Sequence, residues 1–340
     1  MEKPFSLAPM AELSHRALRE LVEGFGGCDE YFTEMISSGA LIGGGPFESW
    51  YIDTGPRPEK LVFQLVGADS GQLVKAASLL NRMECRGIDI NMGCSAPLIR
   101  KTGAGVAWMA SIDRAGELVA GLRKAVSRRL SVKLRIGFQD DFDYLARFCR
   151  RLEAEGVDLI TLHPRTAPEK FKRRARWEYV GRLKRELRIP VAGNGDIDTA
   201  EDLFSRATAC AGDSDLCDAV MVGRGAVRRP WIFAEARKIQ AAALEGGAVF
   251  AGEGREAAAA HIEETGVRFL ELLARYQPPE FHLSRARRFF AYFCDNLKWG
   301  NYLKNILNRE ESLHGIERAW RDYFTRHGET GASAFTSELQ

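Results

Sequence analysis

The chain has 340 residues, of which 45% are hydrophobic and 28% are charged, and these proportions are typical of a folded globular protein rather than a disordered one. Its formal net charge is only +2, so an argument for nucleic-acid binding has to rest on local patches of charge. The sequence has no apolar stretch of signal-peptide length near its start and no run of roughly 18 apolar residues, so we expect a cytoplasmic protein without a membrane partner.

Short apolar runs alternate with longer amphipathic patterns up to about residue 240. Eight runs cover residues 5–10, 30–35, 60–67, 87–93, 131–137, 159–165, 189–196 and 219–226. Most are apolar at successive positions, which is typical of strands covered on both faces. Eight such repeats predict an α/β fold, a (β/α)8 TIM barrel. A doubly wound sheet is the alternative, but it needs a GxGxxG turn after its first strand, where this chain reads LAPMAELSH.

The composition changes after the last of these repeats. An Ala/Gly-rich stretch at 241–260 leads into two long helical patterns, at 261–276 and 284–307. The sequence QPPE between them predicts a helix break. We therefore expect a barrel domain over residues 1–242, a smaller all-α helical domain over 243–330 and a flexible tail over 331–340.

The seven cysteines are scattered along the chain, and none forms a CxxC pair. This pattern disfavours both a disulfide framework and a zinc site. Cys94 stands apart because it follows the run 87–93, next to Gly93 and close to Asn91. A cysteine at the exposed end of a strand can act as a reagent, whereas a buried one is usually inert. We expect inert packing of the other six: Cys28, Cys85, Cys149, Cys210, Cys217 and Cys294.

Polar residues stand at the carboxyl ends of most of the predicted strands, where a TIM barrel carries its active site. A lysine on an inner strand is costly unless an anion pairs with it, so Lys133 suggests a cofactor or a carboxylate nearby. In chain order these ends present Pro9 and Met10, Glu34, Gln64, Asn91 and Cys94, Lys133 and Arg135, His163 and Arg165, Asn194 and Asp196, and Gly223 and Arg224.

Two glycine-flanked turns, AGNGD and VGRGA, follow the last two predicted strands. Phosphate sites in TIM barrels are commonly built from the loops after strands seven and eight, where free backbone N–H groups face the anion. Arg224 adds a positive charge there. The alternative is that these glycines only make tight turns.

Taken together, these motifs resemble the tRNA-dihydrouridine synthase family. The resemblance covers most of residues 5–235, and the helical pattern RARRFFAYFCDNLKWGNYLKNIL is similar to that family's tRNA-binding domain. The motifs occur in the order LAPMA, FQLVG, DINMGCSAP with GAGVAWM, VKLRIG, LHPRT, GNGDI and VMVGRGAVRRPWIF.

The resemblance implies an enzyme that uses reduced FMN, recharged by NADPH, to saturate the C5–C6 bond of a uridine in tRNA. It implies that Asn91 and Arg165 face the uracil and that Cys94 is the general acid. The implied cofactor residues are Pro9, Met10 and Ala11 along the flavin ring, Gln64 and Lys133 at its polar edge, His163 against the ring or phosphate, and Asn194, Gly195, Asp196, Gly223 and Arg224 around the phosphate.

The chemistry of a thiol suits that role. Hydride delivered to C6 leaves negative charge on the uracil, and C5 must then accept a proton. An ordinary thiol, with a pKa of about 8.5, is mostly protonated at neutral pH and can donate without an activating base. The target base has to leave its stack to reach a barrel mouth.

The sequence departs from the family in two places. Ser95 stands where a proline usually follows the catalytic cysteine, which predicts a less rigid loop. The stretch after HPRT is unusually basic, and a phosphate-backbone contact or a solvated face can each explain it. Its basic residues are Lys170, Lys172, Arg173, Arg174 and Arg176.

Arginines in the helical pattern also suit contact with an RNA backbone rather than base reading. These are Arg285, Arg287 and Arg288, and we expect the neighbouring Phe and Trp residues to form the core of a helical bundle.

Two other functions stay open. An FMN barrel acting on a free pyrimidine shares the phosphate turns and Lys133 but has no need of a basic helical domain. A non-catalytic RNA-binding protein has no need of Cys94. We expect a monomer, and the sequence does not indicate which uridine is reduced.

Overall fold

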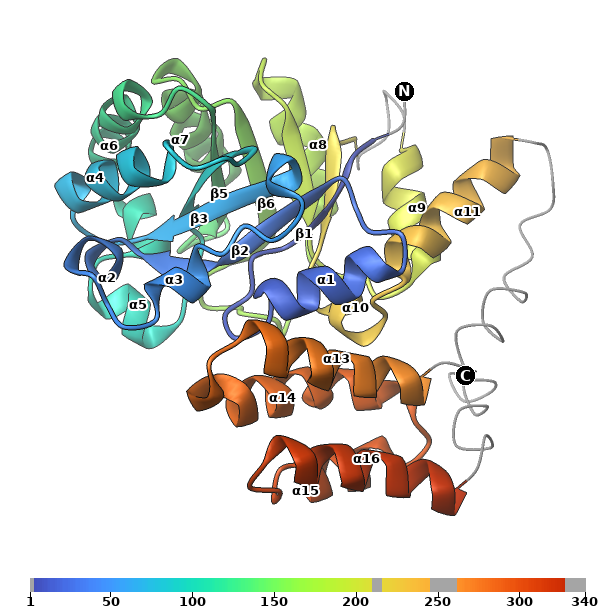
Figure 1. Ribbon diagram of the computed structural model, residues 1–340. Coiled ribbons are helices and arrows are strands. Elements are labelled where there is room, and N and C mark those ends of the chain that lie inside the picture. Colours follow the sequence, from blue (N-terminus) through green and yellow to red (C-terminus); the bar gives the residue numbers. More distant parts are fainter. Residues whose placement is uncertain (1–2, 210–215, 245–261, 328–340) are drawn as a thin grey trace. The chain divides into compact units, whose positions relative to one another are not determined.

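The computed structural model of the chain describes residues 3–209, 216–244 and 262–327 (Figure 1). It divides into two compact units whose segments interleave along the sequence. The first unit comprises residues 1–10, 29–197 and 205–223, and the second comprises 11–28, 198–204 and 224–340. Most of the expected connection at 241–260 and all of the expected tail at 331–340 lie outside the described residues.

The first unit is built on a closed barrel of eight parallel strands, each paired with its neighbours in sequence and β1 with β8. This confirms the predicted TIM barrel. The strands are β1 (Phe5–Leu7), β2 (Glu30–Ser37), β3 (Leu61–Val66), β4 (Gly87–Met92), β5 (Arg129–Gly137), β6 (Leu159–Thr166), β7 (Val191–Asn194) and β8 (Ala219–Val222).

Amphipathic helices follow the strands and bury one face each. Asp69, Ser111 and Asp141 cap three of them by accepting a hydrogen bond from the backbone N–H three residues on, as N-cap residues do. The helices of this unit are α2 (Ser38–Gly43), α3 (Glu48–Tyr51), α4 (Ser70–Leu80), α5 (Pro97–Lys101), α6 (Ile112–Ala125), α7 (Phe142–Ala154) and α8 (Trp177–Glu186), with 3-10 turns at Pro58–Lys60 and Gly105–Ala110; α9 (Ala200–Thr208) contributes its end.

The interior of the barrel changes from apolar to polar along the strands. Val62 belongs to an apolar cluster with Ala8, Phe32 and Met221. Gln64 follows Val62 by two positions and therefore faces the same way. The strand register sets Gln64 beside Asp89 and Asp89 beside Ser131. A buried polar layer thus lies next to the apolar one, towards the carboxyl ends of the strands.

The second unit is helical, as predicted for the C-terminal region. Its core is aromatic: the rings of Phe269 and Phe289 stack with centroids 3.7 Å apart, and Phe290, Phe293 and Trp320 are buried around them. Its helices are α1 (Arg16–Gly24), α10 (Arg224–Arg228), α11 (Ile232–Leu244), α13 (Ile262–Tyr276), α14 (Pro279–Phe293), α15 (Gly300–Leu307) and α16 (Leu313–His327), with a 3-10 turn at Cys294–Asn296.

The predicted break at QPPE is confirmed, because Pro278 is the N-cap of α14. The single pattern expected over 284–307 is wrong, since α14 ends at Phe293 and α15 starts only at Gly300. A side chain at Gly300 would collide with the carbonyl oxygen of Cys294, so the chain can fold back there only at a glycine. In the described part of the chain, no helix is both long and apolar enough to cross a membrane.

Candidate active site at the carboxyl ends of the strands

Cys94 lies in a tight turn directly after β4. The side-chain oxygen of Asn91 accepts hydrogen bonds from the backbone N–H groups of Gly93 (3.1 Å) and Cys94 (2.8 Å). From the other side, the Val106 N–H donates to the Cys94 carbonyl oxygen at 3.0 Å. Cys94 is half-buried, whereas every other cysteine that the structure describes is buried. It is therefore the described thiol that a substrate can reach.

The buried cysteines behave as the sequence predicts. Burial raises the pKa of Cys85 and Cys149, and it raises that of Cys294 to about 12. Such thiols carry little thiolate at neutral pH, so they are poor nucleophiles. Cys28 and Cys217 are also buried, and Cys210 lies outside the described residues.

A chain of hydrogen bonds runs beneath the Cys94 turn through four buried polar residues. The Ser131 hydroxyl donates to Asp89 Oδ1 (2.6 Å), and the Gln64 side-chain NH2 donates to Asp89 Oδ2 (2.7 Å). The Asn91 NH2 in turn donates to Gln64 Oε1 at 2.9 Å. Gln64 and Asp89 are completely buried, so these bonds replace water that neither side chain can reach.

Two ionisable groups of this region have shifted pKa values. Burial raises the pKa of Asp89 to about 6, although its bonds from Ser131 and Gln64 and the charge of Lys133 oppose that rise. Burial, and then the charge of Arg135, lower the pKa of Lys133 to about 8, while Asp89 and Cys94 oppose that fall. Lys133 is beside Asn91 in the register, and no hydrogen bond of its amine is present in the described part of the chain.

His163 and Arg165 emerge from β6 and contact each other. Arg165 Nη1 lies 3.0 Å from His163 Nε2. Because a guanidinium can only donate, His163 Nε2 is the acceptor in this contact. Arg165 is 3% exposed and also donates to Asp196 Oδ1 and to the Arg173 carbonyl oxygen, both at 2.5 Å. The guanidinium expected to face the uracil is thus engaged inside the protein.

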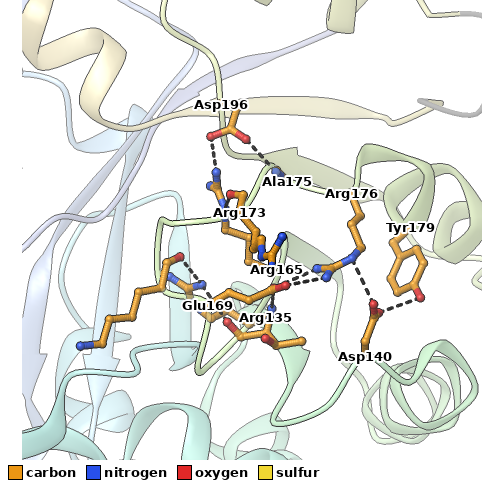
Figure 2. A network of polar contacts seen from close by, with 11 residues as sticks. Arg135, Asp140, Arg165, Glu169, Arg173, Ala175, Arg176, Tyr179 and Asp196 are labelled. Atoms are coloured by element: carbon orange, nitrogen blue, oxygen red, sulfur yellow. Dashed lines mark hydrogen bonds and ion pairs between the residues drawn. The ribbon is translucent and has the colours of Figure 1, made fainter.

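The basic loop after β6 is tied down by ion pairs (Figure 2). Glu169 binds both terminal nitrogens of Arg176, at 2.5 and 2.9 Å, and accepts from the Thr166 N–H at 2.8 Å. The Arg176 guanidinium lowers the pKa of Glu169 to about 2. Asp140 forms an ion pair with Arg176 Nε at 3.2 Å and accepts a hydrogen bond from the Tyr179 hydroxyl.

Two further contacts fix the same loop. Asp196 Oδ2 accepts from the Ala175 N–H at 2.7 Å, and Arg135 donates to the Lys170 carbonyl oxygen at 3.0 Å. Lys172, Arg173 and Arg174 have exposed side chains. The loop is therefore anchored through its acidic and backbone groups, while these three cations face solvent.

The turn after β7 holds two consecutive residues in the left-handed region of φ. Gly195 has φ +118° and Asp196 has φ +52°. A side chain at Gly195 would come within 3.0 Å of the His163 ring, so the backbone here passes close to a predicted site residue. The Asn194 NH2 donates to the Met221 carbonyl oxygen at 2.7 Å and joins β7 to β8.

The remaining predicted cofactor residues follow the first strand, β1, and the last strand, β8, which are neighbours in the barrel. A Cβ on Gly223, which follows β8, would lie 3.6 Å from Met10 Sδ. Pro9 and Met10 are half-buried after β1. Ala11 and Arg224 are the next residues in sequence and belong to the second unit.

In the helical unit, the three predicted RNA-contact arginines differ. Arg285 is 2% exposed and lies over the Phe281 ring, so it does not face solvent. Arg287 is half-buried and donates to the Glu310 carbonyl oxygen at 2.7 Å. Arg288 is exposed, with Glu12 at 3.9 Å. Only Arg288 has the exposure that a phosphate contact requires.

The expectation that the Phe and Trp residues here form core is wrong at Trp299. Trp299 is 53% exposed and Tyr302 is 59% exposed, and Lys298 Nζ lies 5.6 Å from the Trp299 ring. The sequence carries a signal for this surface, because no acidic residue occurs from Asn296 to Arg309. An exposed aromatic pair without neighbouring carboxylates is suited to stacking on nucleobases.

Comparison with known proteins assigns the chain to a family. The family model described as dihydrouridine synthase (Dus) matches residues 6–323. The chain belongs to the dihydrouridine synthase family. Dihydrouridine has two hydrogens more than uridine, so the chain is an oxidoreductase. The resemblance of its motifs to this family is confirmed.

Curated relatives agree with this family. The chain is 32% identical to a probable tRNA-dihydrouridine synthase of Aquifex aeolicus over 67% of this chain and 71% of that protein. It is 31% identical to a tRNA-dihydrouridine(16) synthase of Ralstonia nicotianae, over 66% and 70%. It is 32% identical to a tRNA-dihydrouridine(47) synthase [NAD(P)(+)]-like protein of Rattus norvegicus, over 68% and 36%. Relatives of similar identity thus have names that differ in the uridine position.

Proposed function

We propose that this protein reduces the C5–C6 bond of a uridine in tRNA and that Cys94 donates the proton to C5. One observation carries this proposal: among the described cysteines, Cys94 is the one that is half-buried rather than buried. It follows β4, in which Asn91 lies beside Lys133 of β5. A general acid has to reach the reacting carbon. The turn that Asn91 holds gives the thiol such a position.

The residues at the strand ends fit FMN as the cofactor. Lys133 is a half-buried cation whose amine has no hydrogen bond among the described residues, and a buried cation of this kind favours an anionic partner. It would hold the flavin's polar edge, while the backbone at Gly195 and Gly223 would hold the phosphate, with Pro9, Met10 and His163 along the ring. When bound and reduced, FMN supplies the hydride. NADPH as the reductant is part of the same proposal.

The side chains of this site divide the remaining work. Asn91 uses its oxygen on the Cys94 turn and one N–H on Gln64, so one N–H is left for the uracil edge. Arg165 supports His163 and the loop through Asp196, and its contact with uracil would require it to exchange one of these partners.

Two exposed surfaces are proposed to contact the tRNA. Lys172, Arg173 and Arg174 form a cationic edge on an anchored loop of the barrel unit, suited to phosphates. In the helical unit, Arg288 offers a phosphate contact, while Trp299 and Tyr302 offer rings for exposed bases. Arg285 is left out of this set because its side chain is buried.

The test is the variant Cys94→Ala. We expect it to retain FMN, judged by its visible absorbance, and to lose dihydrouridine formation by about 100-fold or more, which is the usual contribution of a general acid. Ser95→Ala is the matched control, because it removes the neighbouring hydroxyl and keeps the thiol.

Two results would overturn the proposal. Full activity of Cys94→Ala would remove the thiol from the mechanism, and a wild-type protein that cannot bind FMN would remove the cofactor. Reduction of free uridine as fast as of tRNA would favour the free-pyrimidine enzyme instead. Function in the cytoplasm and as a monomer stay predictions, to be checked by fractionation and by light scattering.

A further inference from the structure

The hydrogen-bond chain beneath Cys94 has a fixed direction. At one end is the Asp89 carboxylate, which only accepts when ionised, and at the other are the Gly93 and Cys94 N–H groups, which only donate. Between them stand two side-chain amides, Gln64 and Asn91, each with one donor end and one acceptor end. Only one orientation of each amide satisfies all of these groups, and it is the one observed.

Asp89 is the group that sets this direction. If the Gln64 amide turned over, its oxygen would face the carboxylate, and its NH2 would face the NH2 of Asn91. Asn91 would then have to turn as well, which would point its NH2 at two backbone N–H groups. The burial of Gln64, Asp89 and Asn91 leaves no water to absorb such a reversal.

We propose that Asp89 is a positioning residue, which fixes the Cys94 turn by orienting first Gln64 and then Asn91. The role in catalysis rests on the proposed function, because it matters only if Cys94 is the proton donor. The positive charge of Lys133 favours the ionised carboxylate, and the Ser131 hydroxyl occupies its second oxygen. The backbone of Gln64 is held separately, by donation from its N–H to Thr33 Oγ1 at 3.0 Å.

The direction of this hydrogen-bond chain can be reversed by exchanging the acid at position 89 with the amide at position 91. Asn91→Asp keeps the acceptor for the Cys94 N–H but places a second acceptor against Gln64 Oε1. Asp89→Asn is the second single variant of the cycle: its new oxygen can accept from Gln64 and its new NH2 can donate to the Ser131 hydroxyl, so the original direction stays possible, although position 89 no longer enforces it. In the double variant, Gln64 can turn over and find a donor at position 89 and an acceptor at position 91.

The readout is the rate at which iodoacetamide alkylates Cys94 in the full-length protein, followed by peptide mass mapping. We expect Asn91→Asp to raise this rate about tenfold, Asp89→Asn to change it less than about threefold, and the double variant to return within about threefold of wild type, which is a coupling of ordinary size for contacting residues. In the dihydrouridine assay, kcat should be higher in the double variant than in Asn91→Asp, although both variants lack the Asn91 N–H proposed for the uracil edge.

The proposal is overturned if Asn91→Asp leaves alkylation unchanged, or if the double variant is no closer to wild type than the single one. A role of Asn91 in substrate binding alone predicts the former result. Alkylation needs neither tRNA nor reductant, so it judges the hydrogen-bond chain even if the wild-type protein makes no dihydrouridine, which would refute the proposed function separately.

Discussion

Two polar networks lie close to the predicted site, and they are built differently. The one beneath Cys94 is completely buried at Gln64 and Asp89 and depends on the direction of amide groups. The one in the loop after β6 is partly exposed and depends on charge pairs such as Glu169–Arg176 (Figure 2). Buried hydrogen bonds are screened little by salt, whereas partly exposed ion pairs are screened more.

This difference separates two tasks. A buried directional network holds a reacting group in one place, because reversing any member leaves a polar atom unsatisfied. A network of ion pairs holds a loop while leaving other cations exposed for a polyanion. The networks should therefore fail in different ways when single residues are replaced.

The largest effect is expected for Gln64→Leu in the buried network. The replacement removes a donor from the Asp89 carboxylate and an acceptor from Asn91, and leaving such buried groups unpaired costs about 3 kcal/mol of unfolding free energy. Urea unfolding at low and high NaCl measures this loss. A loss that halves at high salt would show that charge rather than hydrogen bonding dominates this network.

A smaller effect is expected on tRNA binding when the exposed cations are neutralised. Replacing Lys172, Arg173 and Arg174 by Gln should weaken binding and flatten the slope of log K against log salt by up to about two. The backbone bond from Arg165 to the Arg173 carbonyl oxygen is kept in this variant.

The matched comparison is the aromatic pair of the helical unit. Trp299→Ala with Tyr302→Ala should weaken tRNA binding about tenfold through lost stacking and leave the salt slope unchanged. An unaltered slope in the cation variant would identify those side chains as a solvated face. Unaltered affinity in the aromatic variant would remove Trp299 and Tyr302 from the RNA surface.

The smallest effect is expected for Glu169→Gln in the ion-pair network, about 1 kcal/mol at neutral pH because the pair is partly exposed. The Glu169 pKa is lowered from 4.5 to about 2, so its carboxylate stabilises the fold above the unfolded-state pKa and loses that contribution as the pH falls towards about 2. The difference between wild type and variant should therefore narrow between pH 4.5 and 2. A difference that stays constant across this range would contradict the pairing with Arg176.

The barrel could be predicted from the sequence because each strand is a short apolar run and several of its helices, such as α4, α6 and α7, begin with a capping Asp or Ser. Each of the eight predicted runs overlaps one strand. Cys94 could be singled out for a similar local reason, because the glycine and asparagine that make its turn are adjacent in sequence. The break between α14 and α15 was missed because it depends on the approach of Gly300 to Cys294 in three dimensions.

The sequence could not predict which side chains of the site bind one another. Arg165 and Asp196 both stand at strand ends, which made each a candidate for ligand binding, but only the fold shows that they bind each other. The sequence does not indicate a role for Asp89, because this residue lies within an apolar strand and its partners Gln64 and Ser131 come from the neighbouring strands. Charge alone also could not distinguish the buried Arg285 from the exposed Arg288.

The anchored loop after β6 has a consequence for the kinetics of the encounter. Its Arg165–Asp196 and Glu169–Arg176 pairs form when the protein folds, so the conformational entropy of the loop is lost at that stage and not when RNA arrives. A cationic surface that is already ordered can capture a polyanion at a rate set by diffusion and electrostatic steering. The RNA recognition proposed for this loop is thus a docking event that needs no folding step.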